Sequence, residues 1–253
     1  MLVLNNVFAP EIISIEEFIQ EISGIRSVDS VELLFEFYEV YLSITDKDKQ
    51  ESFENFANWA KTVLQDFNEI DQYLINTQAI FAYLRDVQRL KKWSVKGEFK
   101  ETKLMKDHLI FMERLGVYYS KFYSFLLDKK IGYQGLMYRE ATTKTAAFIN
   151  KHPHKKFFFI GFNALNKAEE FLFKAFLENG KSEVYWDIDR AFFKSNHSAG
   201  SFIRKYKTKW KYYEKNGLKQ ISNHFLAEKN IEIIGASKNI SQLKYAGEIL
   251  KDF

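Results

Sequence analysis

The sequence predicts an α/β protein with a large all-helical region: helices over residues 1–153, then a small parallel α/β unit over residues 154–253. Two observations predict this fold class. Apolar residues recur at helical spacing through residues 13–150, where no strand pattern is evident. After Pro153, short β-rich segments alternate with helical ones, which is the order of right-handed parallel βαβ units.

The helical region opens with a capping signal and continues with apolar stripes. Ser14 stands at an N-cap position and Glu17 follows three residues later, which is the spacing of a capping box. Residues 103–130 predict a long central helix, and residues 92–102 predict a long loop. Two helical stripes are predicted to be core: Val31, Leu34, Phe35, Tyr38 and Tyr41 or Leu42 in the first, and Phe53, Phe56, Trp59, Ala60, Val63 and Phe67 in the second.

The α/β unit has three predicted strands and two predicted helices. The four apolar residues from Phe157 to Ile160 are typical of a buried strand. A helix follows over Leu165 to Asn179, and Gly180 suits the C′ position after it. The remaining elements are a strand over residues 182–188, a strand over residues 231–236 and a helix over residues 237–253.

The overall composition predicts a soluble, cytoplasmic protein. The chain has 253 residues, of which 46% are hydrophobic, so it can bury a substantial core. It has no cysteine, which excludes disulfides and thiolate metal sites. No apolar run approaches the roughly 20 residues of a membrane helix, and the N-terminus lacks the layout of a signal peptide.

Charge is distributed unevenly along the chain, although the net charge is only +4. Residues 1–84 hold 15 acidic and 4 basic residues, a net charge of −11. Residues 85–150 hold 7 acidic and 14 basic residues (+7), and residues 151–253 hold 11 and 19 (+8). This polarity indicates either an anionic partner for the later part or two regions that attract each other.

The motifs of nucleotide hydrolysis are absent. No GxxxxGK[ST] or GxGxxG pattern occurs, which argues against ATP hydrolysis by the chain alone, and we expect no cofactor. The first strand ends at Ile160-Gly161-Phe162 without the carboxylate that would organise Mg²⁺. Glu98 and Lys100 form an E-x-K pair of the kind that metal-dependent nucleases use, but they fall in the predicted loop.

Asp187 and Asp189 stand together at the end of the second predicted strand. Such a pair can hold Mg²⁺ or Mn²⁺ with a nucleotide-sugar diphosphate, because hard oxygen ligands suit hard cations. The alternative is that they cap a helix or a strand-end turn. The five histidines show no spacing typical of a metal site, and we expect no metal.

Residues 202–219 combine basic and aromatic side chains, with Glu214 as the one acid. Cationic groups can neutralise phosphates and aromatic rings can stack on bases, so this stretch is a candidate nucleic-acid contact. The alternative is a helix whose aromatic side chains pack inward while its lysines remain solvated. The candidate DNA-binding residues are Arg204, Lys205, Lys207, Lys209, Trp210 and Lys211.

Several segments together resemble the helicase-like part of the PD-(D/E)XK nuclease-family proteins related to the AddB-type subunit of helicase–nuclease repair complexes. These segments are "PEIISIEEFIQEISG" and "ELLFEFYEVYLSI" near the start, "FFFIGFNALNKAEEFLFKAFLENGKSEVYWDIDRAFF" with the following "HSAGSFIRKY", and "IEIIGASKNISQLKYAGEIL" near the end. The resemblance covers most of the chain and depends on the combination, because no single motif is diagnostic.

The resemblance implies a partial RecA-like, P-loop NTPase-like parallel sheet with a helical insertion domain. Ile160 stands where related subunits carry the Walker B acid, so the nucleotide site is reduced to its scaffold. Such degenerate domains are expected to support a complex and guide DNA. A Walker A region, a second RecA-like domain and the nuclease domain have no counterpart among these residues, so we expect a piece of a longer protein or a decayed gene product.

Three functions follow as hypotheses. The first is a non-catalytic, helicase-like portion of a DNA-repair nuclease-family protein that contacts single- or double-stranded DNA or a partner subunit, and no membrane. The second is a metal-dependent nucleotide-sugar transferase that uses Asp187 and Asp189. The third is a protein-interaction module whose acidic residues 1–84 recruit a basic partner.

Overall fold

The computed structural model describes residues 9–94, 103–180 and 182–251. This part of the chain is mostly helical and holds two small parallel sheets. None of its helices combines the length and the apolar character that crossing a bilayer requires. In chain order the elements are α1 (Ile15–Ser23), β1 (Arg26–Ser27), α2 (Ser30–Ile44), η1 (Lys47–Lys49), α3 (Phe53–Gln72), α4 (Thr77–Ser94), α5 (Lys103–Lys129), β2 (Ile131–Gly132), α6 (Gln134–Lys151), β3 (Phe157–Phe162), α7 (Lys167–Glu178), β4 (Ser182–Trp186), α8 (Arg190–Lys194), η2 (Ser198–Gly200), α9 (Ser201–Lys209), α10 (Tyr212–Lys215) and α11 (Asn239–Lys251).

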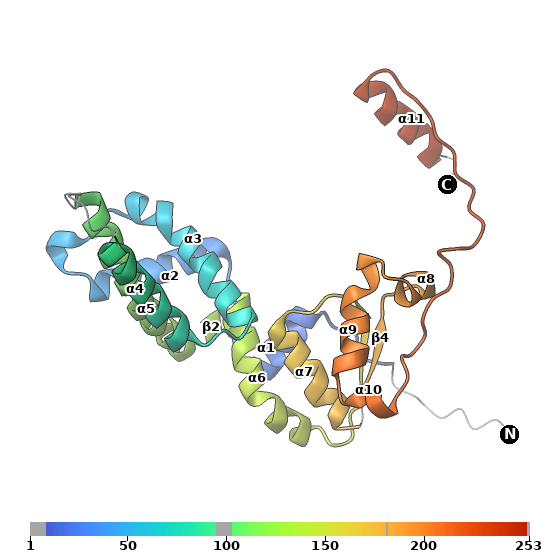
Figure 1. Cartoon of the computed structure of the whole chain (residues 1–253), viewed down its shortest axis with the longest axis horizontal. Coiled ribbons are helices and arrows are strands. Elements are labelled where there is room, and N and C mark those ends of the chain that lie inside the picture. Colours follow the sequence, from blue (N-terminus) through green and yellow to red (C-terminus); the bar gives the residue numbers. More distant parts are fainter. Residues whose placement is uncertain (1–8, 95–102, 181, 252–253) are drawn as a thin grey trace.

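Helix α6 joins two lobes (Figure 1). Helices α2 to α5 gather in the first lobe, and the sheet β3–β4 lies in the second with α7 to α10. Helix α6 contacts α1, α3 and α7, so it belongs to both lobes. Helix α1 packs in the second lobe, where the ring centroid of Phe18 lies 5.4 to 5.9 Å from those of Phe148, Phe157, Phe159 and Phe176. The aromatic core is therefore continuous across residue 153.

The capping signal at the first helix is confirmed. Ser14 Oγ accepts a hydrogen bond from Glu17 N, and Glu17 Oε2 accepts one from Ser14 N. The second predicted stripe is confirmed as well, because Phe56, Ala60 and Phe67 are fully enclosed along α3. The predicted long central helix is α5.

The first predicted stripe is partly wrong. Val31 and Phe35 are 61% and 56% exposed, whereas Phe37 is fully buried. Helix α2 packs against both α3 and α5, and the face of α2 that they cover is the one that carries Phe37. The ring of Phe35 instead stacks at the surface on Phe53, with centroids 4.7 Å apart.

The predicted long loop overlaps the end of a helix. Residues 92–94 belong to α4, so the helix continues beyond the point where the loop is predicted to begin. Residues 95–102, including the Glu98–Lys100 pair, lie outside the described residues.

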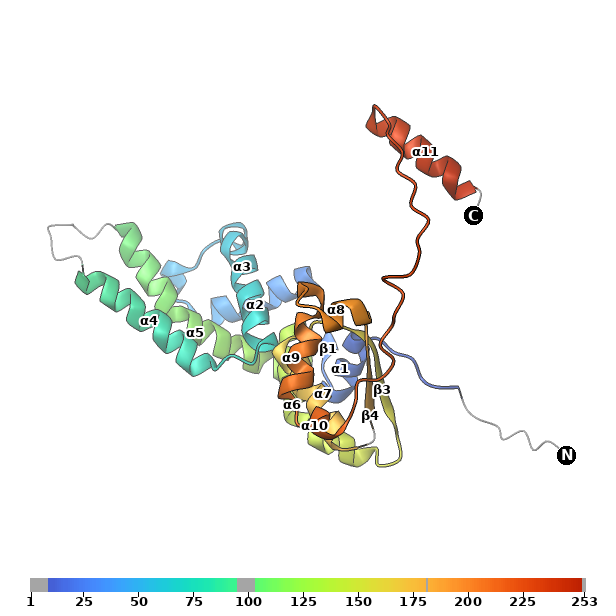
Figure 2. The same cartoon turned by 45° about the vertical axis from the view of Figure 1, so that its right-hand side comes forward.

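The predicted parallel pair of strands is present as β3 and β4, which run from Phe157 opposite Ser182 to Phe162 opposite Trp186. The predicted burial of the first strand is wrong, because only one of its faces is covered: Phe159 is buried, whereas Phe158 and Ile160 are 53% and 70% exposed. The predicted strand over residues 231–236 is wrong. This segment is irregular and unpaired, and Ile233 is 93% exposed. Its apolar pattern suits a strand, but a strand also needs a neighbour, and the chain moves away from the sheet (Figure 2). The two-residue parallel pair β1–β2 was not predicted, because it is too short to carry a periodic signal in the sequence.

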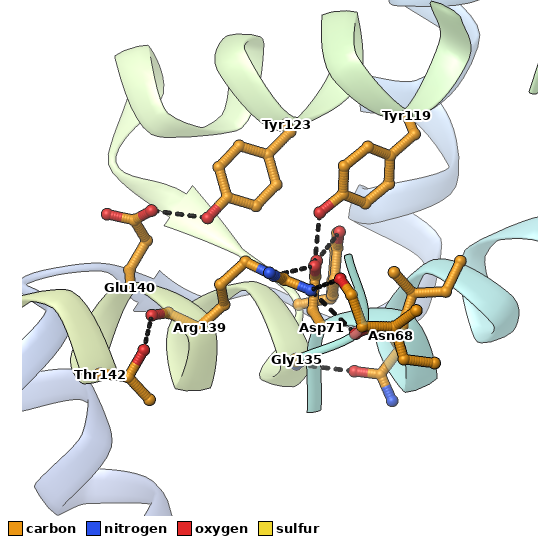
Figure 3. A network of polar contacts seen from close by, with 11 residues as sticks. Asn68, Asp71, Tyr119, Tyr123, Gly135, Arg139, Glu140 and Thr142 are labelled. Atoms are coloured by element: carbon orange, nitrogen blue, oxygen red, sulfur yellow. Dashed lines mark hydrogen bonds and ion pairs between the residues drawn. The ribbon is translucent and has the colours of Figure 1, made fainter. Parts of the chain in front are cut away.

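A buried carboxylate ties the first lobe to α6 (Figure 3). Asp71, at the end of α3, has no exposed surface. Its two oxygens accept hydrogen bonds from the hydroxyls of Tyr119 and Tyr133, and Arg139 Nε lies 2.6 Å from Asp71 Oδ1. Burial raises the pKa of Asp71, and the two hydroxyls and the guanidinium oppose that rise. The network thereby holds α3, α5, α6 and the residue after β2 in one arrangement.

Gly135 allows α6 to approach α3 closely beside this network. Its backbone N donates to Asn68 Oδ1 at 2.7 Å. A Cβ at this position would lie 2.2 Å from the carbonyl oxygen of Asn68, which is closer than atoms can approach. The contact between the two helices therefore requires glycine.

Candidate nucleic-acid interface

The basic, aromatic stretch forms α9 and α10, and its apolar side chains face inward. Ile203, Tyr206, Trp210 and Tyr213 recur at helical spacing and are at most 3% exposed. For these side chains the alternative interpretation of the sequence is therefore confirmed: they pack into the core.

Trp210 is fixed in the core by neighbours on three elements. Its ring lies 5.7 Å from that of Trp186 on β4, and its Nε1 donates to Glu170 Oε1 on α7 at 3.2 Å. Trp186 Nε1 in turn donates to the hydroxyl of Tyr213 on α10 at 2.7 Å. In this arrangement Trp210 cannot stack on a base without leaving the core.

Two of the predicted DNA-binding residues, Arg204 and Lys207, instead make hydrogen bonds to nearby backbone carbonyl oxygens. Arg204 donates to the carbonyl oxygens of Phe192 and His197, at 2.6 and 2.7 Å. Lys207 Nζ donates to the carbonyl oxygen of Tyr213 at 2.5 Å. These bonds fix α8 and α10 against α9, so a substitution at either residue would disturb the fold as well as a surface charge.

The other three predicted lysines are free to meet a ligand. Lys205, Lys209 and Lys211 are exposed, and none makes a hydrogen bond or ion pair within the described part of the chain. Lys205 and Lys209 are four residues apart on α9, so they lie on the same face of the helix. These lysines present unneutralised positive charge to solvent.

A groove of about 350 Å³ lies beside Lys205, at the carboxyl end of β3. In open α/β sheets, the carboxyl ends of strands are where ligands bind. Two exposed aromatic side chains flank it: Tyr73 at the end of α3 is 52% exposed, and Phe202 at the start of α9 is 44% exposed. The residues lining the groove are Tyr73, Ala164, Leu165, Asn166, Lys167, Glu170, Phe202, Lys205 and Tyr206.

The sequence interpretation missed Tyr73, Lys167 and Phe202. A weak signal existed for Phe202, which is a large aromatic residue one position away from the buried stripe that starts at Ile203. No local signal could identify Tyr73, because it reaches the groove only through the packing of α3 against α7. The groove is thus a product of tertiary structure.

Lys211 lies elsewhere, in a hollow of about 870 Å³ at the amino ends of β3 and β4. The lining of this hollow carries both signs of charge, including Lys215, Lys219 and Glu183. Lys219 and Glu183 form an ion pair at 3.7 Å. The six predicted contacts therefore do not form one surface: Lys205 faces the groove, Lys211 faces the hollow, and Trp210 is interior.

Glu170 contributes the carboxylate that lines the groove. It pairs with Lys174 at 2.7 Å and with Lys167 at 3.1 Å. Burial opposes its ionisation, but the hydrogen bonds and charges of Lys174 and Lys167 together outweigh burial and lower its pKa to about 2. The ion pairs leave less of the charge of Lys167 available to a ligand than that of Lys205.

Glu170 should make stability depend on pH at acid pH. A carboxyl whose folded pKa is about 2, against its ordinary 4.5, stabilises the folded state above pH 4.5, and this contribution is lost as pH falls toward 2. Urea unfolding should therefore show a smaller loss of free energy between pH 5 and pH 3 for Glu170→Gln than for the wild type. Glu178→Gln, an exposed change on the same helix, should retain the wild-type loss. Equal losses in all three proteins would contradict the assignment.

Asp189 acts as a capping residue. Its Oδ1 accepts from Ala191 N, and its Oδ2 accepts from Ser222 Oγ, His224 N and Phe225 N. These bonds, led by the one from Ala191, lower the pKa of Asp189 to about 2. Across the described ranges, no three His, Cys, Asp or Glu side chains gather as a metal site would require. This geometry gives the transferase hypothesis no support.

The tip of β3 carries no acid. Ile160 is 70% exposed, and Gly161 adopts a φ of +86°, a conformation that favours glycine. The strand pairing is irregular between Ile160 and Phe162. The first polar side chain beyond the strand is Asn163, whose Nδ2 donates to the carbonyl oxygen of Asp187 at 2.9 Å.

Fold and site together define a helix-rich α/β protein with a cationic, aromatic-flanked groove at a strand end. In comparisons with known proteins, no family model, no curated protein and no solved structure matches this chain.

Proposed function

We propose that this chain binds nucleic acid without catalysing a reaction on it, as the helicase-like portion of a DNA-repair protein of the PD-(D/E)XK nuclease family. The observation that supports this most is the groove at the end of β3, which is lined by Lys205 and by the exposed side chains of Tyr73 and Phe202. Cations meet phosphates and rings stack on bases, so this combination suits a single strand with accessible bases.

Each part of the surface has its own task in this proposal. Lys205 and Lys209 neutralise successive phosphates along the exposed face of α9. Phe202 and Tyr73 supply stacking platforms where the strand crosses the end of β3. In this proposal the chain holds or guides the strand.

Reversing the free charges should weaken binding and reduce its dependence on salt. In the variant Lys205→Glu/Lys209→Glu/Lys211→Glu, affinity for a fluorescently labelled single-stranded DNA should fall by on the order of tenfold or more. The slope of log affinity against log salt should become shallower by about 1.4, since Lys205 and Lys209 lie on the proposed path of the strand and each single-strand phosphate contact contributes about 0.7. The matched control reverses the same number of charges away from the groove, at the exposed residues Lys61, Lys121 and Lys151. An unchanged slope in the triple variant would exclude these lysines as phosphate contacts and leave a subunit-contact role.

Removing the ring of Phe202 should weaken binding without unfolding the protein. Phe202→Ala should cost about 1 to 3 kcal/mol of binding free energy to single-stranded DNA, the range for loss of one stacked base. Its effect on stability should be small because the ring is 44% exposed. Phe171→Ala, at a ring of similar exposure (48%) on α7, should bind like the wild type. If both variants weaken binding alike, the effect is not local to the groove.

A further inference from the structure

Residues 231–251 lie apart from both lobes. The segment 231–236 is extended, and α11 lies clear of the rest of the described chain in two views (Figures 1 and 2). Its backbone hydrogen bonds stay within the segment, such as the one from Gln242 N to the carbonyl oxygen of Lys238. A helix of 13 residues is marginal in water when nothing packs against it.

This unit carries a row of uncovered apolar side chains. Ile231 and Ile233 are 72% and 93% exposed, and in a β-strand residues two positions apart would point to the same side. On α11, Ile240, Leu243 and Leu250 share one stripe and are 63% to 73% exposed. Contiguous apolar surface of this kind marks an interaction site.

The sheet β3–β4 has the complementary deficiency. The sheet has two strands and packs on α7 by one face, where Phe159 stacks on Phe173, but β3 has no neighbour on the edge away from β4 among the described strands. On the face opposite α7, Phe158 is 53% exposed and Ile160 is 70% exposed. One further strand and one helix would cover the open edge and this bare face.

The chain's own segment leaves on the wrong side to do this directly. Ser222 N donates to the carbonyl oxygen of Ile188, and the carbonyl oxygen of Ser222 accepts from Arg190 N, so the chain runs past the β4 side of the sheet. Asp189 Oδ2 fixes the next residues through His224 N and Phe225 N. Residues 231–236 would therefore have to cross a face of their own sheet to reach the free edge of β3.

We propose that two copies of this chain exchange residues 231–251, so that each copy's segment 231–236 pairs with the free edge of the other copy's β3 and its α11 covers Phe158 and Ile160. Every chain carries both the uncovered segment 231–251 and the open edge of β3 that would receive it. A two-fold pair therefore covers both surfaces of both copies at once. The surface is therefore a self-association surface, and it is separate from the groove beside Lys205.

Engineered cysteines test this cleanly, since the chain has none of its own. Ile160→Cys and Ile233→Cys are made in separate chains that carry different tags, mixed, and oxidised. The expected result is a disulfide between the two different chains, and a particle of twice the mass of one chain by light scattering before oxidation. In the control, a chain with Val31→Cys takes the place of the chain with Ile160→Cys. Val31 has similar exposure and lies on α2, so little disulfide should form with Ile233→Cys.

A second variant keeps the result interpretable. Ile233→Glu, at a site whose side chain is almost fully exposed, should fold normally and shift the wild-type particle toward the mass of one chain. A chain that carries both Ile160→Cys and Ile233→Cys should give mainly interchain links. A monomer in which the two introduced thiols link within one chain would overturn the exchange and show that the segment completes its own sheet. A monomer without any link would overturn self-association altogether.

Discussion

Asp71→Ala should lower the free energy of unfolding by about 3 to 5 kcal/mol, the cost of removing one partner from a buried charge pair. The carboxylate is completely buried and accepts from Tyr119, Tyr133 and Arg139. Its loss leaves two buried hydroxyls and a largely enclosed guanidinium without their acceptor. Because these residues come from α5, α6 and the turn between β2 and α6, the first lobe should separate from α6 as it unfolds.

Urea unfolding followed by far-UV circular dichroism measures this effect. Asp66→Ala is the matched control, because Asp66 lies on the same helix with an exposed side chain, and it should change stability by no more than about 0.5 kcal/mol. If Asp71→Ala costs no more than the control, the network does not hold the lobe in place.

Trp210→Ala should be similarly severe, at about 3 to 5 kcal/mol of unfolding free energy, because it empties the space of a large aromatic residue in a closed core. The ring contacts those of Trp186 and Tyr213, and its Nε1 donates to Glu170. Trp210→Phe keeps most of the apolar volume and should cost clearly less than the alanine change.

The same position separates a structural role from a binding role. Trp210→Phe, which stays folded, should bind single-stranded DNA like the wild type, whereas Phe202→Ala should bind less tightly and remain as stable as the wild type. If Trp210→Phe loses DNA binding, measured by anisotropy under conditions where the protein is folded, then Trp210 contacts the DNA and its assignment to the core alone is wrong.

The elements that sequence predicts well are those with strong local patterns. The capping box at Ser14, the stripe along α3 and the pair β3–β4 each combine periodicity with a clear boundary signal. The strand over residues 231–236 fails because pattern cannot supply a pairing partner. The predicted burial of Phe35 is wrong because the buried face of α2 is set by its packing against α3 and α5. The spacing of apolar residues alone cannot show which side of α2 those helices cover.

The site is predictable only in part for the same reason. Composition identifies a basic stretch, but it cannot separate Lys205, which is free, from Lys207, which holds a carbonyl oxygen. Composition also selects Trp210 as a DNA-binding residue, although its helical spacing with Tyr206 places it in the core. Tyr73 is 129 positions before Phe202 in the chain, so only the packing of the two lobes brings them to one groove.

The most direct test of nucleic-acid binding is the anisotropy of a labelled single-stranded oligonucleotide titrated with the wild-type chain at low and at moderate salt, without ATP. We expect saturable binding at low salt that weakens steeply as salt rises, because lysine–phosphate contacts release counterions. Absence of binding at low salt would contradict it.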